Sequence, residues 1–179
     1  MDTADASFGR FFVRVTACHM TTYFVAGVLA FTLMNYETSF QSENLACYML
    51  PTSSPWVAAG PALQVIRGLI FALALYPFRQ VFLTGQRGGL KLFGLLLGLA
   101  ILSTSGPAPG SIEGMIYTRL PVLGQILGLW ETVLQTLAFS LLLVAWCRKP
   151  TRAWAVAMGV LTGLVVLMSL AGILAPRPF

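Results

Sequence analysis

The chain has 179 residues, of which 57% are hydrophobic and only 9% charged, and its formal net charge is +5 at pH 7. A soluble domain carries about 25% charged residues, so this composition excludes a water-soluble globular protein, and the apolar content excludes a disordered one. An outer-membrane barrel is also excluded, because its strands alternate apolar and polar residues, whereas the apolar runs here are continuous. We therefore expect an all-α, polytopic integral membrane helix bundle.

Five apolar segments are candidates for transmembrane helices, each of which needs about 20 mostly apolar residues. The third segment is short and would borrow residues from its flanks. No connecting segment is long enough for a soluble domain, so the sequence predicts a single membrane domain over residues 1–179. The predicted spans cover residues 11–34, 56–78, 89–103, 121–146 and 153–174, and the outer loops cover 35–55 and 104–120.

Lysine and arginine residues predict the orientation, because cytoplasmic loops of membrane proteins carry an excess of them. Two basic residues, Arg119 and Arg177, lie on one side of the predicted bundle, and eight lie on the other. We expect a cytoplasmic N-terminus and an outer C-terminus, in a plasma membrane or a bacterial-type inner membrane. The eight residues are Arg10, Arg14, Arg79, Arg87, Lys91, Arg148, Lys149 and Arg152.

Glycine pairs at four-residue spacing predict where helices approach closely, because both members lie on one helix face and small residues drive packing in lipid. Three spans carry such a pair, and the second span carries a weaker one with alanine. Packing within the monomer is favoured over self-association, which stays open as the alternative. The pairs are Gly94/Gly98, Gly124/Gly128, Gly159/Gly163 and the weaker Gly68/Ala72.

Two charged residues fall in the middle of predicted spans. Arg67 lies in the second span and Glu131 in the fourth, and an isolated charge at that depth is costly. Since the two spans run in the same direction, we predict an Arg67–Glu131 ion pair inside the bundle. Gln64 and Gln135 share the faces of these residues. The polar cluster either locks two helices together or forms a site for a substrate, an ion or a proton.

His19 is the only histidine and lies within the first span. We expect a neutral imidazole that is hydrogen-bonded across the bundle. Two functional alternatives remain open: a proton relay with Glu131, and axial ligation of a haem or chlorin. No other cofactor is expected, and no metal site is expected, since the three cysteines and one histidine lack the spacing of a zinc site.

The second outer loop carries a further set of candidates, Ser111, Glu113, Tyr117 and Arg119. Ser111 is expected to cap a short helix with Glu113 in its first turn, where a negative charge is favourable. The apolar cluster around Tyr117 is expected to fold back onto the bundle, as a lid over the polar cluster. The alternative is an ordinary connection between two spans.

No catalytic motif is present, neither a nucleotide-binding glycine pattern nor a metalloprotease or hydrolase signature. The sequence therefore favours a small accessory or assembly subunit that packs against other membrane proteins or against itself. Two alternatives are a small transporter or ligand-binding protein that uses the Arg67–Glu131 pair, and a lipid-modifying enzyme that uses Glu113, Glu131 and His19. The expected partners are the lipid bilayer and these proteins only. Nucleic acid is not expected as a partner, because the excess of basic residues lies in the predicted cytoplasmic loops.

Overall fold

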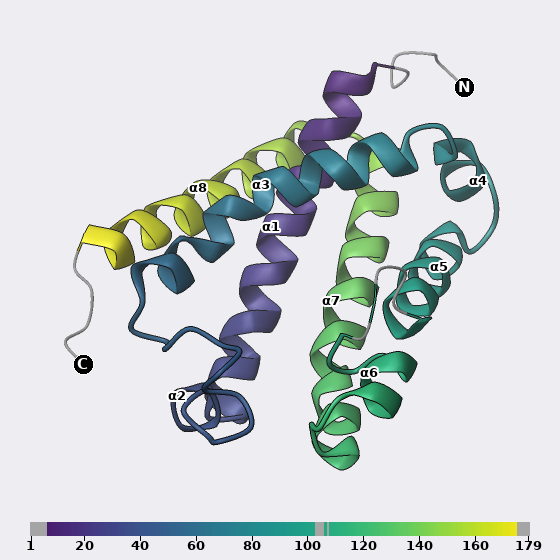
Figure 1. Ribbon diagram of the computed structural model, residues 1–179. Coiled ribbons are helices and arrows are strands. Elements are labelled where there is room, and N and C mark those ends of the chain that lie inside the picture. The colour runs from purple at the N-terminus through teal and green to yellow at the C-terminus, as the bar shows by residue number, and fades with distance from the viewer. Residues whose placement is uncertain (1–6, 103–105, 107, 175–179) are drawn as a thin grey trace.

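The computed structural model describes residues 7–102, 106 and 108–174, and all of its regular secondary structure is helical (Figure 1). Four helices are long and apolar enough to cross a membrane: α1, α3, α7 and α8. The helices are α1 (Phe8–Leu33), α2 (Tyr36–Ser39), α3 (Pro55–Leu75), α4 (Arg79–Leu83), α5 (Gly88–Leu102), α6 (Ile112–Tyr117), α7 (Val122–Arg148) and α8 (Arg152–Leu174).

The predicted spans correspond to these long helices within a few residues, and the third corresponds to α5, which has 15 residues. The largest difference lies at the end of the second span, which we expected to continue to residue 78. The helix α3 ends at Leu75, and α4 begins separately at Arg79. Pro77 explains the break, because proline has no backbone N–H to continue the hydrogen-bond pattern of the helix.

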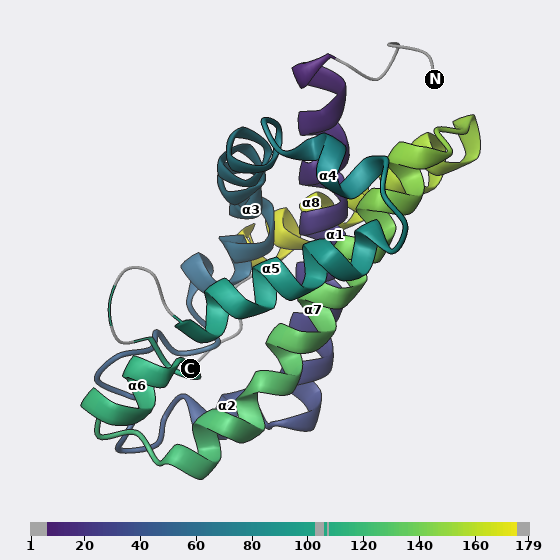
Figure 2. The ribbon, with the colours of Figure 1, turned by 90° about the vertical axis from the view of Figure 1, so that its right-hand side faces the viewer.

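The helix α1 lies at the centre of the bundle and contacts α3, α7 and α8. In the most apolar 18-residue stretch of α1, 56% of the residues are buried, against 17% in the corresponding stretch of each of the other three long helices. In Figure 1, α3 and α8 run side by side across α1, whereas Figure 2 shows α5 lying along α7. The helix α3 is therefore strongly inclined to α1, which is important for the positions of its polar side chains.

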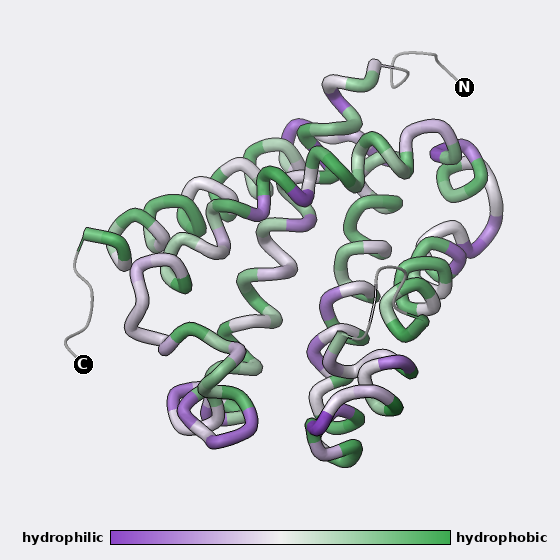
Figure 3. The backbone as a smooth tube through the Cα atoms, in the orientation of Figure 1, coloured by the Kyte–Doolittle hydropathy of each residue, from purple (hydrophilic) through white to green (hydrophobic). Residues whose placement is uncertain are grey.

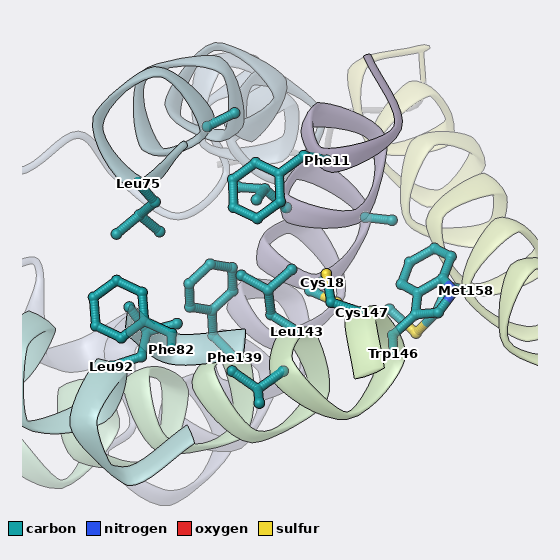
Figure 4. Packing of buried hydrophobic residues seen from close by; sticks show 14 residues of the cluster. Phe11, Cys18, Leu75, Phe82, Leu92, Phe139, Leu143, Trp146, Cys147 and Met158 are labelled. Atoms are coloured by element: carbon teal, nitrogen blue, oxygen red, sulfur yellow. The ribbon is translucent and has the colours of Figure 1, made fainter. Parts of the chain in front are cut away.

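The apolar core is concentrated at one end of the bundle, the end that carries the predicted cytoplasmic loops. It is built from the beginning of α1, the end of α7 and parts of α3, α4, α5 and α8 (Figure 4). Phe139 and Leu143 of α7 belong to this cluster together with Val15 and Cys18 of α1, and all four are almost fully buried. Hydrophilic residues gather in the connections, such as the turn between α4 and α5 (Figure 3). The opposite end of the bundle is less tightly packed and contains the hollows described below.

The glycine pairs do not pack as we expected. A Cβ atom added at Gly94, Gly98, Gly124, Gly128, Gly159 or Gly163 would meet nothing within 4 Å, so all three predicted pairs lie on open faces. The weaker pair is the one that packs: at Gly68 a Cβ would lie 2.5 Å from the Thr16 side-chain oxygen and 2.9 Å from the Thr16 Cα. Ala72, on the same face, is fully buried. The close contact between α1 and α3 therefore depends on Gly68.

Candidate functional site

Polar residues of three helices meet around a cavity of about 510 Å³ between α1, α3, α5 and α7, which we call the inner cavity. His19, Arg67 and Gln135, predicted separately from the sequence, all line it. Its complete lining is His19, Arg67, Phe71, Leu96, Leu99, Ala100, Pro109, Gly110, Leu129, Thr132, Gln135, Thr136 and Phe139.

His19 is held in one orientation by Gln64. The Gln64 amide nitrogen donates to the Gly60 carbonyl at 3.3 Å, which turns the amide oxygen toward His19. This oxygen only accepts, so the His19 Nε2–H donates to it, at 3.1 Å. The ring edges of Phe71 and Phe139 also pack around the imidazole, at centroid distances of 4.9 and 5.9 Å. The expected hydrogen bond across the bundle is present, with Gln64 as the partner.

Arg67 and Glu131 do not form the predicted ion pair among the residues that the structure describes. The Arg67 guanidinium lies over the Phe71 ring, with its carbon 5.9 Å from the ring centroid. Glu131 instead accepts a hydrogen bond from the Tyr36 hydroxyl. The prediction assumed that α3 and α7 run parallel, so that equal positions along the helices would meet. The inclination of α3 across α1 removes that correspondence (Figure 1).

A second hollow of about 810 Å³, which we call the outer groove, adjoins the inner cavity at the end with the predicted outer loops. Residues of α7 connect the two hollows: Gly124, Gly128 and Glu131 line the groove, and Gln135 lines the cavity. The groove is lined by Tyr23, Met34, Pro109, Gly110 and residues within 36–49 and 120–132. Both hollows share Pro109, Gly110, Leu129 and Thr132.

The hydrogen bond between Tyr36 and Glu131 makes a pH-dependent contribution to the free energy of unfolding. Burial, followed by the hydrogen bond and the charge of Glu131, raises the pKa of Tyr36 above its ordinary value of 10.0. Because the folded-state pKa is the higher one, the contribution of Tyr36 to stability is complete below about pH 10 and is lost as the pH rises above it. We expect the free energy of unfolding in detergent to fall more steeply above about pH 10 for the wild type than for Tyr36→Phe.

The matched control is Tyr48→Phe, because Tyr48 lies on the same outer loop and is 67% exposed. This variant should follow the wild-type pH dependence. Parallel curves for the wild type and Tyr36→Phe would contradict the prediction.

The second outer loop folds against the bundle, but through different residues from those expected. Ser111 caps α6 as predicted, since its hydroxyl accepts a hydrogen bond from the Gly114 N–H at 2.9 Å, and Glu113 lies in the first turn. The apolar cluster does not fold back: Ile116 is 63% and Tyr117 is 73% exposed. Arg119 is also exposed. The residues of this loop that line both hollows are Pro109 and Gly110, rather than the apolar cluster.

Gln125, which is not among the site residues predicted from the sequence, holds this loop through hydrogen bonds. Its side-chain oxygen accepts a hydrogen bond from the Gly110 N–H at 3.1 Å. Its amide nitrogen donates to the Leu120 carbonyl at 3.0 Å and also to the Gly114 carbonyl at 3.4 Å. The side chain is buried, although it lies near the beginning of an apolar span. A glutamine within an otherwise apolar segment was the sequence feature that could have identified this residue.

Replacing Gln125 with leucine is expected to release the loop over residues 108–121. The substitution leaves the Gly110 N–H without its acceptor and removes every hydrogen bond from the amide to the loop. Cleavage by a protease within the loop should become at least about fivefold faster, since losing such bonds costs about 1–3 kcal/mol of local stability. Gln80→Leu, at an exposed glutamine of α4, should be cleaved like the wild type. Equal cleavage rates for the two variants would show that Gln125 does not hold the loop.

No protein-family model, curated protein or solved structure matches this chain. Among the described residues, no group of three His, Cys, Asp or Glu side chains is placed to hold a metal ion. The three residues suggested for a lipid-modifying enzyme do not converge: His19 lines the inner cavity, Glu131 lines the outer groove, and Glu113 lies on α6. The functional proposal therefore rests on the inner cavity.

Proposed function

We propose that this chain is a small membrane protein that binds or carries a small molecule in its inner cavity. The observation that supports the proposal is the convergence of His19, Arg67 and Gln135 on one hollow of about 510 Å³. Cavities of about 300–1,000 Å³ with a few polar groups on an apolar wall are typical of small-molecule sites. The transporter or ligand-binding alternative is thereby favoured over the accessory subunit that the sequence favoured.

Arg67 provides the physical reason for a ligand. Ionisable side chains within membrane spans are costly, and they are usually paired or face a functional cavity. The structure gives Arg67 an aromatic neighbour but no carboxylate partner among the described residues. A ligand that contributes hydrogen-bond acceptors would compensate the guanidinium in a way that Phe71 alone does not.

The first test is native mass spectrometry of protein extracted from its own membrane in a mild detergent, combined with an absorption spectrum. The wild type should carry a bound small molecule that is lost from the double variant Arg67→Met with Gln135→Leu. Lys91→Met, at an exposed lysine of α5, should keep it. Wild-type protein without any bound molecule would contradict the proposal. A visible absorption band would support the alternative of a haem or chlorin bound by His19.

A second candidate function, the accessory or assembly subunit, is supported by the open glycine faces. Gly159 and Gly163 on α8 are exposed and have no neighbour within 4 Å of an added Cβ. Such a face permits a helix of another subunit to approach closely. The same mass spectra test this function: a co-purifying protein that is lost from Gly159→Ile with Gly163→Ile would support it, and retention by this variant would exclude that face.

We also propose that the N-terminus is cytoplasmic, the C-terminus lies outside, and the chain crosses a plasma or bacterial-type inner membrane five times. The positive-inside bias supports this orientation. The chain contains its own probe, because Cys47 is exposed in the first outer loop whereas Cys18 and Cys147 are buried. A membrane-impermeant maleimide should therefore label the wild type in intact cells and fail to label Cys47→Ser. Labelling that requires inside-out vesicles would show the opposite orientation.

A further inference from the structure

The charge of the inner cavity indicates which kind of molecule it accepts. Among the described lining residues, Arg67 is the only lysine or arginine, and none is an aspartate or glutamate. The nearest acidic residue of α7, Glu131, lines the adjoining groove and is occupied by the Tyr36 hydroxyl. The cavity therefore presents one uncompensated positive charge, which favours a ligand with one negative charge.

The hydrogen-bonding groups of the cavity fit an anionic headgroup. Gln135 makes no side-chain hydrogen bond within the described part of the chain, so its amide N–H groups are available to a ligand. Arginine presents several N–H donors in a planar fork that matches the oxygens of a carboxylate or phosphate. The Thr136 hydroxyl already donates to the Thr132 carbonyl at 2.7 Å, so Arg67 and Gln135 are the lining residues that offer side-chain N–H groups to a ligand, beside the Thr132 hydroxyl.

The remaining wall is apolar. Leu96, Leu99 and Ala100 of α5 line one side, and Phe71 and Phe139 lie beside the imidazole of His19. A purely polar anion would leave this surface without contacts, whereas a hydrocarbon chain would gain about 25 cal/mol for each Å² of apolar surface that it buries. The volume of about 510 Å³ is sufficient for one short hydrocarbon chain.

We propose that the inner cavity binds a single-chain anionic amphiphile, with its carboxylate or phosphate headgroup on Arg67 and Gln135 and its chain against α5. This proposal rests on the proposed function, that the cavity binds a small molecule, and adds the chemical class of that molecule. Fatty acids and single-chain phosphate esters share the required headgroup chemistry.

Four ten-carbon probes of different charge test the proposal: decanoate, decyl phosphate, neutral decanol and decyltrimethylammonium. Native mass spectrometry of the full chain in a neutral detergent measures the occupancy of each. The wild type should bind at least one of the two anions about tenfold more tightly than decanol, which corresponds to one charge-assisted contact. Arg67→Gln should lose this preference and still bind decanol. Arg67→Glu should prefer the cation, and Lys91→Gln should behave like the wild type.

The outcomes separate this proposal from the more general one. Selective binding of decanoate or of decyl phosphate would identify which headgroup is preferred, and both results support the proposal. Equal binding of decanol and both anions by the wild type, unchanged in Arg67→Gln, would overturn the anionic class while leaving a small-molecule site. If folded wild-type protein, verified by its thermal unfolding, bound none of the probes and carried no molecule from its own membrane, the proposed function would fail too.

Discussion

Replacing Gly68 with alanine is expected to lower the free energy of unfolding by about 1–3 kcal/mol, the usual cost of overpacking a tight contact. The added Cβ would lie 2.5 Å from the Thr16 side-chain oxygen and 2.9 Å from the Thr16 Cα. The Cα belongs to the backbone of α1, so rotation of the threonine side chain does not remove the second clash. The helices α1 and α3 must therefore move apart, which loosens the contact around the buried Ala72.

The control for this prediction comes from the glycine pairs on the open faces. Alanine at Gly94 or Gly98 would meet nothing within 4 Å. Since alanine is favoured over glycine in a helix interior by about 1 kcal/mol, these two variants should be as stable as the wild type or slightly more stable. The measurement is unfolding in detergent by heat or by added denaturing detergent. A Gly68→Ala protein as stable as Gly94→Ala would contradict the packing of α1 against α3.

The glycine pairs also show what a helix-face pattern predicts and what it leaves open. Four-residue spacing places Gly94 and Gly98 on one face of a helix, and both lie on one face of α5. Spacing does not specify which helix covers that face, because this depends on the positions of all the other helices. The pair that does pack against another helix is Gly68 with Ala72, in which alanine replaces the second glycine of the motif.

The extents of the long helices were predictable because length and hydropathy act locally along the chain. The capping of α6 by Ser111 was predictable for the same reason, since cap and N–H lie three residues apart. The Arg67–Glu131 ion pair was not, because it required the mutual inclination of two helices. The contacts of Tyr36 with Glu131 and of Gln64 with His19 join residues 95 and 45 positions apart, and neither has a local signal.

The hydrogen bond between His19 and Gln64 should make a measurable contribution to the free energy of unfolding. His19 is 2% and Gln64 is 9% exposed, so both partners of this hydrogen bond are buried. Gln64→Leu leaves the His19 Nε2–H without an acceptor, which should lower the free energy of unfolding by about 1–3 kcal/mol. His19→Phe leaves the Gln64 oxygen without a donor, although Phe71 and Phe139 provide a suitable environment for a phenyl ring.

The double variant, His19→Phe with Gln64→Leu, distinguishes a lost hydrogen bond from lost packing. Replacing both partners with apolar groups removes the unsatisfied atoms, so the double variant should be more stable than the sum of the single changes predicts. The coupling should be about 0.6–1.7 kcal/mol, the range found for hydrogen bonds between membrane helices. Gln80→Leu is the control, because Gln80 is an exposed glutamine of α4 that lies outside the inner cavity. Strictly additive single changes, measured by unfolding in detergent, would show that the His19–Gln64 contact contributes only through shape.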